Sequence, residues 1–91
     1  MSEDEVRSRL AGVEGWKREG NVITWERAFG SFEKAIAFIN QVADLAKEAN
    51  HHPDIYNSWR TVTLALTTHD AGGLTERDFR LAHRINELPT E

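Results

Sequence analysis

The 91-residue sequence contains no cysteine, and this absence excludes several kinds of site. Without a thiol, the chain has no cysteine nucleophile, no disulfide and no cysteine-ligated zinc. Such a composition fits a reducing cytosol, where a fold holds together without disulfides. Hydrophobic residues make up 40% and charged residues 29% of the chain, as in an ordinary globular domain. We expect one domain over residues 1–91, because this length leaves no room for a second catalytic lobe.

Positive charge is also scarce, since 11 Lys and Arg stand against 15 Asp and Glu and give a formal net charge of −4. A negatively charged chain does not attract nucleic acid, so we expect no nucleic-acid partner. No apolar run approaches the ~18 residues of a membrane span, and the acidic residues 1–5 lack the positive charge of a signal peptide. We therefore expect a cytoplasmic protein without a membrane partner.

The first third of the chain predicts a helix followed by a hairpin. Ser2 is a suitable N-cap, and Glu5 completes a capping box for a helix that Gly12 interrupts. A turn signal over 19–21 precedes an alternating run over 22–29. This alternation indicates a half-buried antiparallel strand.

The middle of the chain predicts the longest helix, from the N-cap Ser31 to about Ala49. Its apolar residues recur at helical spacing: Phe32, Ile36, Ile39, Val42, Ala43, Ala46 and Ala49. Asn50 can adopt the left-handed conformation of a helix end, and Pro53 prevents the helix from continuing.

The remaining chain predicts a second hairpin and a third helix. Alternation over 54–68 indicates two strands that meet in a turn near residues 59–60. Thr75 and Asp78 form a capping-box pattern at the start of the last helix. The order α-β-β-α-β-β-α predicts an α+β fold, in which a four-stranded antiparallel sheet has three helices packed on one face.

Three of the four histidines, His51, His52 and His69, lie within nineteen positions of one another. In a hairpin with its turn near residues 59–60, the start of the first strand and the end of the second meet at one rim. Position 52 then lies opposite position 68 or 69, and the three imidazoles can converge on one pocket. Because imidazole titrates near pH 6.5, such a cluster can supply a general acid and a general base. This chemistry suits a dehydration, which needs no nucleophile.

Each of these residues also has a structural interpretation. The adjacent histidines before a proline could simply be polar residues at the end of a helix, without a catalytic role. Three histidines could hold zinc together with Asp70 or Asp78, but the H-E-x-x-H spacing is missing. Asp78 is well explained as the capping partner of Thr75, and we expect His83 to be a solvated surface residue. Trp16 could belong to the core or present its ring to a flat heterocycle.

The histidines belong to a longer spaced set of residues, namely Lys47, His51, His52, Pro53, Trp59, His69 and Asp78. The tryptophan lies six positions past the proline, the last histidine ten further on and the aspartate nine beyond that. This set resembles the signature of the pterin-4a-carbinolamine dehydratases. The segments 15–16, 29–38 and 73–78 are also similar to the family, so the resemblance extends from about Gly12 to Leu88.

The resemblance implies dehydration of 4a-hydroxytetrahydropterin to quinonoid dihydropterin and water, in the recycling of tetrahydropterin and without a metal or organic cofactor. Matching positions make His51, His52 and His69 the catalytic residues. The positions implied to contact the small pterin substrate are Trp16, Asn50, Pro53, Thr67, Thr68, Asp70 and Asp78. One histidine, His51 or His69, is expected to protonate the departing 4a-hydroxyl while a second helps to remove the N5 proton.

Lys47 departs from the resemblance, because many members of the family carry a glutamate there. Glu48 does not replace it, since a helix turns by about 100° per residue. If that glutamate orients a histidine, its loss would reduce turnover. The resemblance also implies a non-catalytic alternative, a protein-interaction module, because animal members act as dimerisation cofactors of a homeodomain transcription factor. Family members assemble and the core of so short a chain is thin, so we expect a homodimer or homotetramer.

Overall fold

The structure is a computed structural model that describes residues 1–89. Its elements are α1 (Glu3–Ala11), β1 (Lys17–Glu19), β2 (Val22–Ala28), α2 (Phe32–Ala49), β3 (Asp54–Ser58), β4 (Thr61–Leu66), the short 3-10 helix η1 (His69–Ala71) and α3 (Glu76–Asn86). The predicted α-β-β-α-β-β-α order and α+β class are confirmed. The 3-10 helix between β4 and α3 is an addition that the sequence pattern did not predict.

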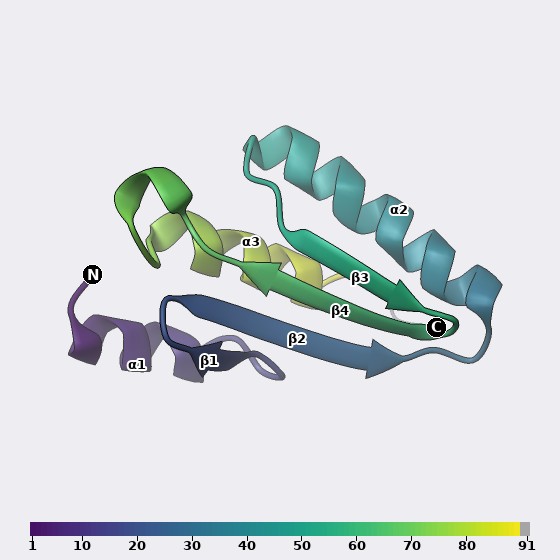
Figure 1. Cartoon of the computed structure of the whole chain (residues 1–91), viewed down its shortest axis with the longest axis horizontal. Coiled ribbons are helices and arrows are strands. Elements are labelled where there is room, and N and C mark those ends of the chain that lie inside the picture. The colour runs from purple at the N-terminus through teal and green to yellow at the C-terminus, as the bar shows by residue number, and fades with distance from the viewer. Residues whose placement is uncertain (90–91) are drawn as a thin grey trace.

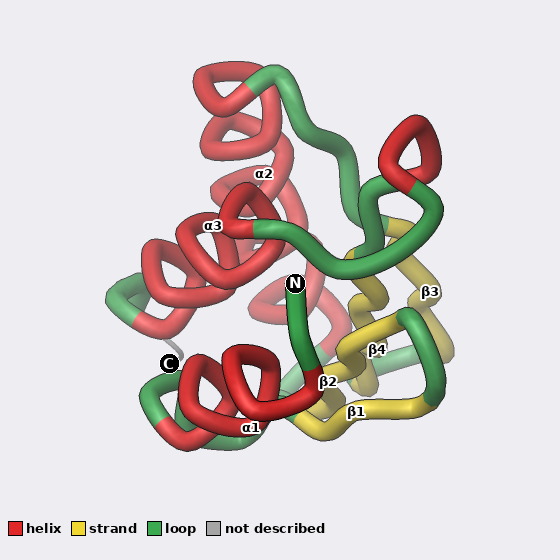
Figure 2. The backbone as a smooth tube through the Cα atoms, turned by 90° about the vertical axis from the view of Figure 1, so that its left-hand side faces the viewer, coloured by secondary structure: helices red, strands yellow, loops and turns green. Residues whose placement is uncertain are grey.

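The four strands form one antiparallel sheet in the order β1-β2-β4-β3 (Figure 1). The helices α1, α2 and α3 lie on one side of this sheet (Figure 2). Alternate side chains of the central strands are buried toward the helices, among them Ile23, Trp25, Val62, Leu64 and Leu66. The alternation in the sequence therefore marks the face that the helices cover.

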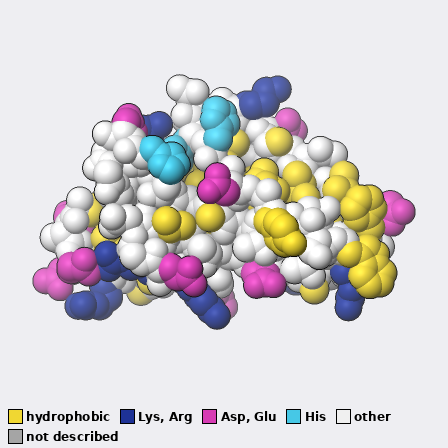
Figure 3. Space-filling view, in the orientation of Figure 1, with side chains coloured by type: hydrophobic (Ala, Val, Ile, Leu, Met, Phe, Trp, Pro, Cys, Tyr) yellow, Lys and Arg dark blue, Asp and Glu magenta, His cyan; other side chains and the backbone are white. Residues whose placement is uncertain are grey.

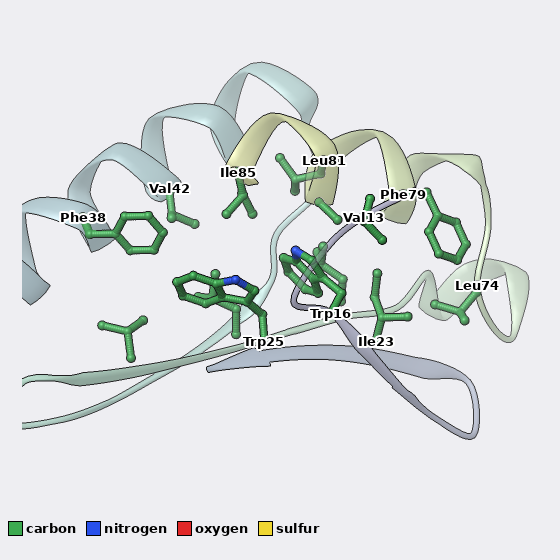
Figure 4. Close-up of a cluster of buried hydrophobic side chains, with 14 of the residues drawn as sticks. Val13, Trp16, Ile23, Trp25, Phe38, Val42, Leu74, Phe79, Leu81 and Ile85 are labelled. Carbon is green, nitrogen blue, oxygen red and sulfur yellow. The ribbon is translucent and has the colours of Figure 1, made fainter. Parts of the chain in front are cut away.

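Aromatic rings fill the space between the sheet and α2 (Figure 4). The ring of Trp25 stacks on Phe38 of α2 at a centroid distance of 5.2 Å, and Phe38 lies 5.0 Å from Phe29. Trp16 lies 6.4 Å from Trp25 on the other side. These rings fix the position of α2 over the sheet, and with it the position of the chain that leaves the helix.

The predicted helix ends are confirmed. The hydroxyls of Ser2, Ser31 and Thr75 each accept a backbone N–H in the first turn of a helix. Asn50 takes the left-handed conformation, with φ of 51° and ψ of 44°, just before Pro53. No helix within residues 1–89 is long and apolar enough to cross a membrane.

The second predicted hairpin is shorter than expected at the end that carries the histidines. β4 ends at Leu66 instead of residue 68, because Thr68 pairs with Gly73 across a local loop. The N–H of Thr68 donates to the Gly73 carbonyl at 3.1 Å, and the N–H of Gly73 donates back at 3.2 Å. Gly72 allows the loop to close, since its φ of 74° is a conformation that favours glycine.

Candidate active site

His51 follows α2 directly, and the end of that helix sets its position. Asn50 turns the chain, and the N–H of His51 donates to the carbonyl of Ala46 at 3.1 Å. The imidazole is 7% exposed, and its Nε2 lies 2.5 Å from Oδ1 of Asp78 in α3. The pair therefore joins the end of α2 to the start of α3.

Asp78 is fully buried, and donors face both of its carboxylate oxygens. Oδ1 faces His51, while Oδ2 accepts from the hydroxyl of Thr68 at 2.8 Å and from the N–H of Thr75 at 2.9 Å. The predicted capping box is confirmed, and the same carboxylate also holds the histidine. A carboxylate only accepts, so this arrangement places a proton on Nε2 of His51.

His52 and His69 are both exposed, and they flank this network on two neighbouring segments. His52 follows His51, and His69 begins η1 directly after Thr68. The last pair of β3 and β4 at this end is Asp54 with Ala65, so position 52 continues toward position 67 and not toward 68 or 69 as expected. Histidine side chains lie on the face of the molecule shown in Figure 3.

A hollow of about 120 Å³ lies beside His51, between the end of α2 and α3. Its lining residues are Ala49, His51, Arg77, Arg80, Leu81 and Arg84. Neither His52 nor His69 lines this hollow, so it is not a pocket shared by the three imidazoles. Convergence of the three histidines on a bound substrate stays a prediction.

Arg77 ties together two of the residues that the resemblance assigns to substrate contact. Its guanidinium donates to the carbonyl of Asn50 at 3.4 Å and lies 3.8 Å from the carboxylate of Asp70. Asn50 and Asp70 are exposed, and Pro53 is half-buried. These three side chains are therefore accessible to a ligand in this structure.

Thr67 and Thr68 differ in exposure because they lie on opposite faces of the chain after β4. Thr67 is half-buried, and its hydroxyl donates to the carbonyl of Asn21 at 2.6 Å. Thr68 is 2% exposed, and its hydroxyl is used inside the network around Asp78. Thr68 can therefore offer a ligand little of its side chain.

Trp16 belongs to the core in this structure. It is 5% exposed, and its Nε1 donates to Oδ1 of Asn86 at 3.0 Å. A contact between this ring and a substrate would require the indole to become accessible. His83 is exposed on α3, as predicted, 3.8 Å from Glu87.

Sequence reasoning missed Arg77, and it identified Thr75 as the N-cap of α3 but not as a partner of Thr68. The hydroxyl of Thr75 lies 2.8 Å from that of Thr68, seven residues earlier in the chain. The threonine before His69 and the capping threonine were both visible in the sequence, but only the closed loop 68–73 brings them together. Residues 1–89 contain no group of three or more His, Asp or Glu side chains placed to hold a metal ion.

Comparison with known proteins defines the class to which this fold and site belong. Residues 1–88 match the family model described as pterin 4 alpha carbinolamine dehydratase. The chain belongs to the pterin-4a-carbinolamine dehydratase family. A relative from Roseiflexus sp. (strain RS-1), provisionally named pterin-4-alpha-carbinolamine dehydratase, is 53% identical over 88 residues, which cover 97% of this chain and 95% of the relative. A relative of the same provisional name from Sulfurisphaera tokodaii is 43% identical over 90 residues, which cover 99% and 97%.

Two solved structures are similar to this one. A transcriptional coactivator/pterin dehydratase from Brucella melitensis has a TM-score of 0.90 at 32% identity, over 94% of each chain. A pterin dehydratase-like protein described as a RuBisCO assembly factor in the alpha-carboxysome has a TM-score of 0.63 at 25% identity, over 78% of this chain and 82% of its own. The fold therefore occurs in proteins described by different activities.

Proposed function

We propose that this protein dehydrates 4a-hydroxytetrahydropterin to quinonoid dihydropterin and water in the cytoplasm, as a step in the recycling of tetrahydropterin. The catalytic residues are His51, His52 and His69. The observation that carries the proposal is a buried His51 held by Asp78, with the exposed His52 next to it in the chain and the exposed His69 directly after Thr68, which also bonds to Asp78. Membership of the dehydratase family supports this assignment of the chemistry.

The reaction removes the 4a-hydroxyl group and the N5 proton of the substrate. One imidazolium donates its proton to the hydroxyl, the C4a–O bond breaks and water leaves. A neutral imidazole accepts the N5 proton while the double bond between C4a and N5 forms. One proton is given and one is taken, so the histidines together return to their starting charge and no oxidant or reductant is needed.

The lysine at position 47 does not leave His51 without a carboxylate partner. It is exposed in the last turn of α2, where many family members carry a glutamate. His51 has a carboxylate partner of its own in Asp78, from a different helix. We therefore expect dehydratase activity in spite of the lysine.

The test is the rate at which quinonoid dihydropterin forms from freshly generated 4a-hydroxytetrahydropterin, followed by absorbance. Loss of general acid-base catalysis typically costs about 10²- to 10⁴-fold in rate, so the double variant His52→Ala/His69→Ala is expected to fall to the spontaneous rate. His83→Ala is the matched control, because this histidine is also exposed but lies within α3, outside the network around Asp78. A double variant as fast as the wild type would contradict the proposal.

The second candidate function is a non-catalytic interaction module. It is favoured by the descriptions of the two similar structures, one as a coactivator and the other as an assembly factor. Wild-type protein that is folded but gives only the spontaneous rate, and that binds a partner protein in stoichiometric amount, would support this function over the first.

We also propose that the protein is a homodimer or homotetramer. β3 is an edge strand, and three large apolar residues in it or just after it are exposed: Ile55 by 40%, Tyr56 by 66% and Trp59 by 74%. Hydrophobic side chains gather at the end of the molecule where the β3–β4 turn lies (Figure 3). An exposed apolar edge is a site for pairing with another strand. Sedimentation of wild type and Tyr56→Lys tests this; a monomeric wild type would contradict it.

A further inference from the structure

The hydroxyl of Thr68 lies inside a closed network of hydrogen bonds. Thr68 is 2% exposed and Asp78 is fully buried. Oγ1 of Thr68 lies 2.8 Å from Oδ2 of Asp78 and 2.8 Å from Oγ1 of Thr75. Oγ1 of Thr75 also accepts the N–H of Arg77 at 3.2 Å. The network therefore connects the end of β4 to the first turn of α3.

Chemistry fixes the direction of each bond in this network. A hydroxyl carries a single proton, and a carboxylate only accepts, so Thr68 donates to Asp78. Thr68 must then accept in its bond with Thr75, which donates in turn. The donors run from the N–H of Arg77 through the two hydroxyls to the carboxylate, and each bond polarises the next.

The same network determines which nitrogen of His51 carries the proton. Oδ2 of Asp78 is held by Thr68 and by the N–H of Thr75, which leaves Oδ1 directed at Nε2 of His51. A neutral His51 then has its proton on Nε2 and a lone pair on Nδ1. No buried polar side-chain atom lacks a partner within residues 1–89, and Nδ1 has no bonded partner, so this nitrogen reaches the surface.

Thr68 also sets the start of the segment that carries His69. Its carbonyl accepts from the N–H groups of Ala71 at 3.1 Å and of Gly73 at 3.2 Å. The backbone of Thr68 therefore closes the loop around η1, while its side chain holds Asp78. One residue connects the positions of His51 and His69.

We propose that Thr68 is a positioning residue: its hydroxyl holds the carboxylate of Asp78 and thereby keeps His51 in the form with its proton on Nε2 and its lone pair on Nδ1. This assigns His51 the part of the base that accepts the N5 proton, and leaves protonation of the hydroxyl to His52 or His69. The part concerning catalysis rests on the proposed function, whereas the part concerning the proton on His51 does not.

Thr68→Val tests the proposal, because valine keeps the shape of the side chain and replaces the hydroxyl by a methyl group that cannot hydrogen-bond. Long-range ¹H–¹⁵N spectra of the imidazoles report where the proton of His51 lies, without any substrate. We expect the Nε2–H form to predominate in the wild type and to be mixed with the Nδ1–H form in Thr68→Val. The dehydration rate should fall about tenfold or more, the usual effect of losing a hydrogen bond to a charged group.

Two further variants separate positioning from a structural effect. Thr68→Ser keeps the hydroxyl and should restore both the spectrum and the rate. Thr63→Val makes the same exchange on β4, where Thr63 is half-buried outside the network, and should leave the His51 spectrum unchanged. If Thr68→Val does not fold, Thr68→Ala is measured in its place.

Each outcome decides one part of the proposal. A His51 spectrum that is the same in the valine or alanine variant as in the wild type would overturn the role of Thr68, whatever the rate. A changed spectrum in Thr68→Ser would overturn it as well. A changed spectrum in the valine variant, restored in serine, in a protein without dehydratase activity would uphold the positioning of His51 and refute the proposed function.

Discussion

Glu76 and Asp78 lie two residues apart in the first turn of α3, yet their surroundings are opposite. Glu76 is 44% exposed and pairs with Arg9 of α1. Asp78 is fully buried, and its carboxylate accepts from three partners: His51, Thr68 and the N–H of Thr75 at the helix start. Two residues turn a helix by about 200°, so the two carboxylates leave α3 on opposite sides. The same helix turn thus provides a surface ion pair and the centre of the candidate site.

An acidic residue in the first turn of a helix therefore does not have its role fixed by that position alone. Both carboxylates suit the positive end of the helix dipole. The two carboxylates differ in their surroundings. Glu76 is open to solvent, whereas neighbouring elements place hydrogen-bond donors around Asp78. For Asp78 the donors come from the end of α2 and the end of β4.

The largest effect should come from Asp78→Ala. It leaves Nε2 of His51, the hydroxyl of Thr68 and the N–H of Thr75 without their acceptor in a buried space. Removing one member of such a buried set typically costs about 3–5 kcal/mol of the free energy of unfolding. Urea unfolding measures this loss, with Glu76→Ala as the matched control. Equal losses of stability in the two variants would contradict the different roles assigned to Asp78 and Glu76.

An intermediate effect is expected for Thr75→Ala. The hydroxyl of Thr75 caps α3 by accepting from Arg77 and also bonds to Thr68. Loss of a capping threonine costs about 1 kcal/mol, and the bond to Thr68 adds to this. Ser2→Ala, which removes the N-cap of α1 at an exposed site, is the control for capping alone. If the two variants are equally stable by thermal unfolding, the bond between the threonines contributes nothing.

The smallest effect should come from the surface pair. A hydrogen bond from Arg9 lowers the pKa of Glu76 from its ordinary value of 4.5. A carboxyl whose pKa is lower in the folded state adds stability above its ordinary pKa, and this stability is lost as the pH falls through the folded value. Glu76→Gln should therefore differ from the wild type near neutral pH and converge with it in acid. Thermal unfolding across pH 2 to 7 checks this; a difference that persists in acid would contradict it.

The parts of the fold that local chemistry determines were predicted from the sequence. The cap residues Ser2, Ser31 and Thr75 were identified because a helix start needs an acceptor close in the chain. The alternation of apolar residues in β4 predicted its buried face, because successive side chains of a strand point to opposite sides of the sheet.

What was missed has both local and distant causes. The turn at Trp59 and Arg60 was predicted, but a two-residue turn pairs Ser58 with Thr61 and so brings position 52 opposite 67 instead of 68 or 69. η1 is three residues long, too short to show a period in the sequence. The burial of Trp16 depends on Asn86, seventy residues away.

Because the three tryptophans differ in exposure, the fluorescence of this protein should report on its self-association and its unfolding. Trp16 and Trp25 are 5% and 8% exposed and their rings are 6.4 Å apart, whereas Trp59 is 74% exposed at the β3–β4 turn. Iodide in the solvent should quench the emission of Trp59 selectively, leaving a blue-shifted component from the buried pair. If self-association covers the β3 edge, the quenchable fraction should fall as the concentration rises, while the buried component stays constant until the core unfolds.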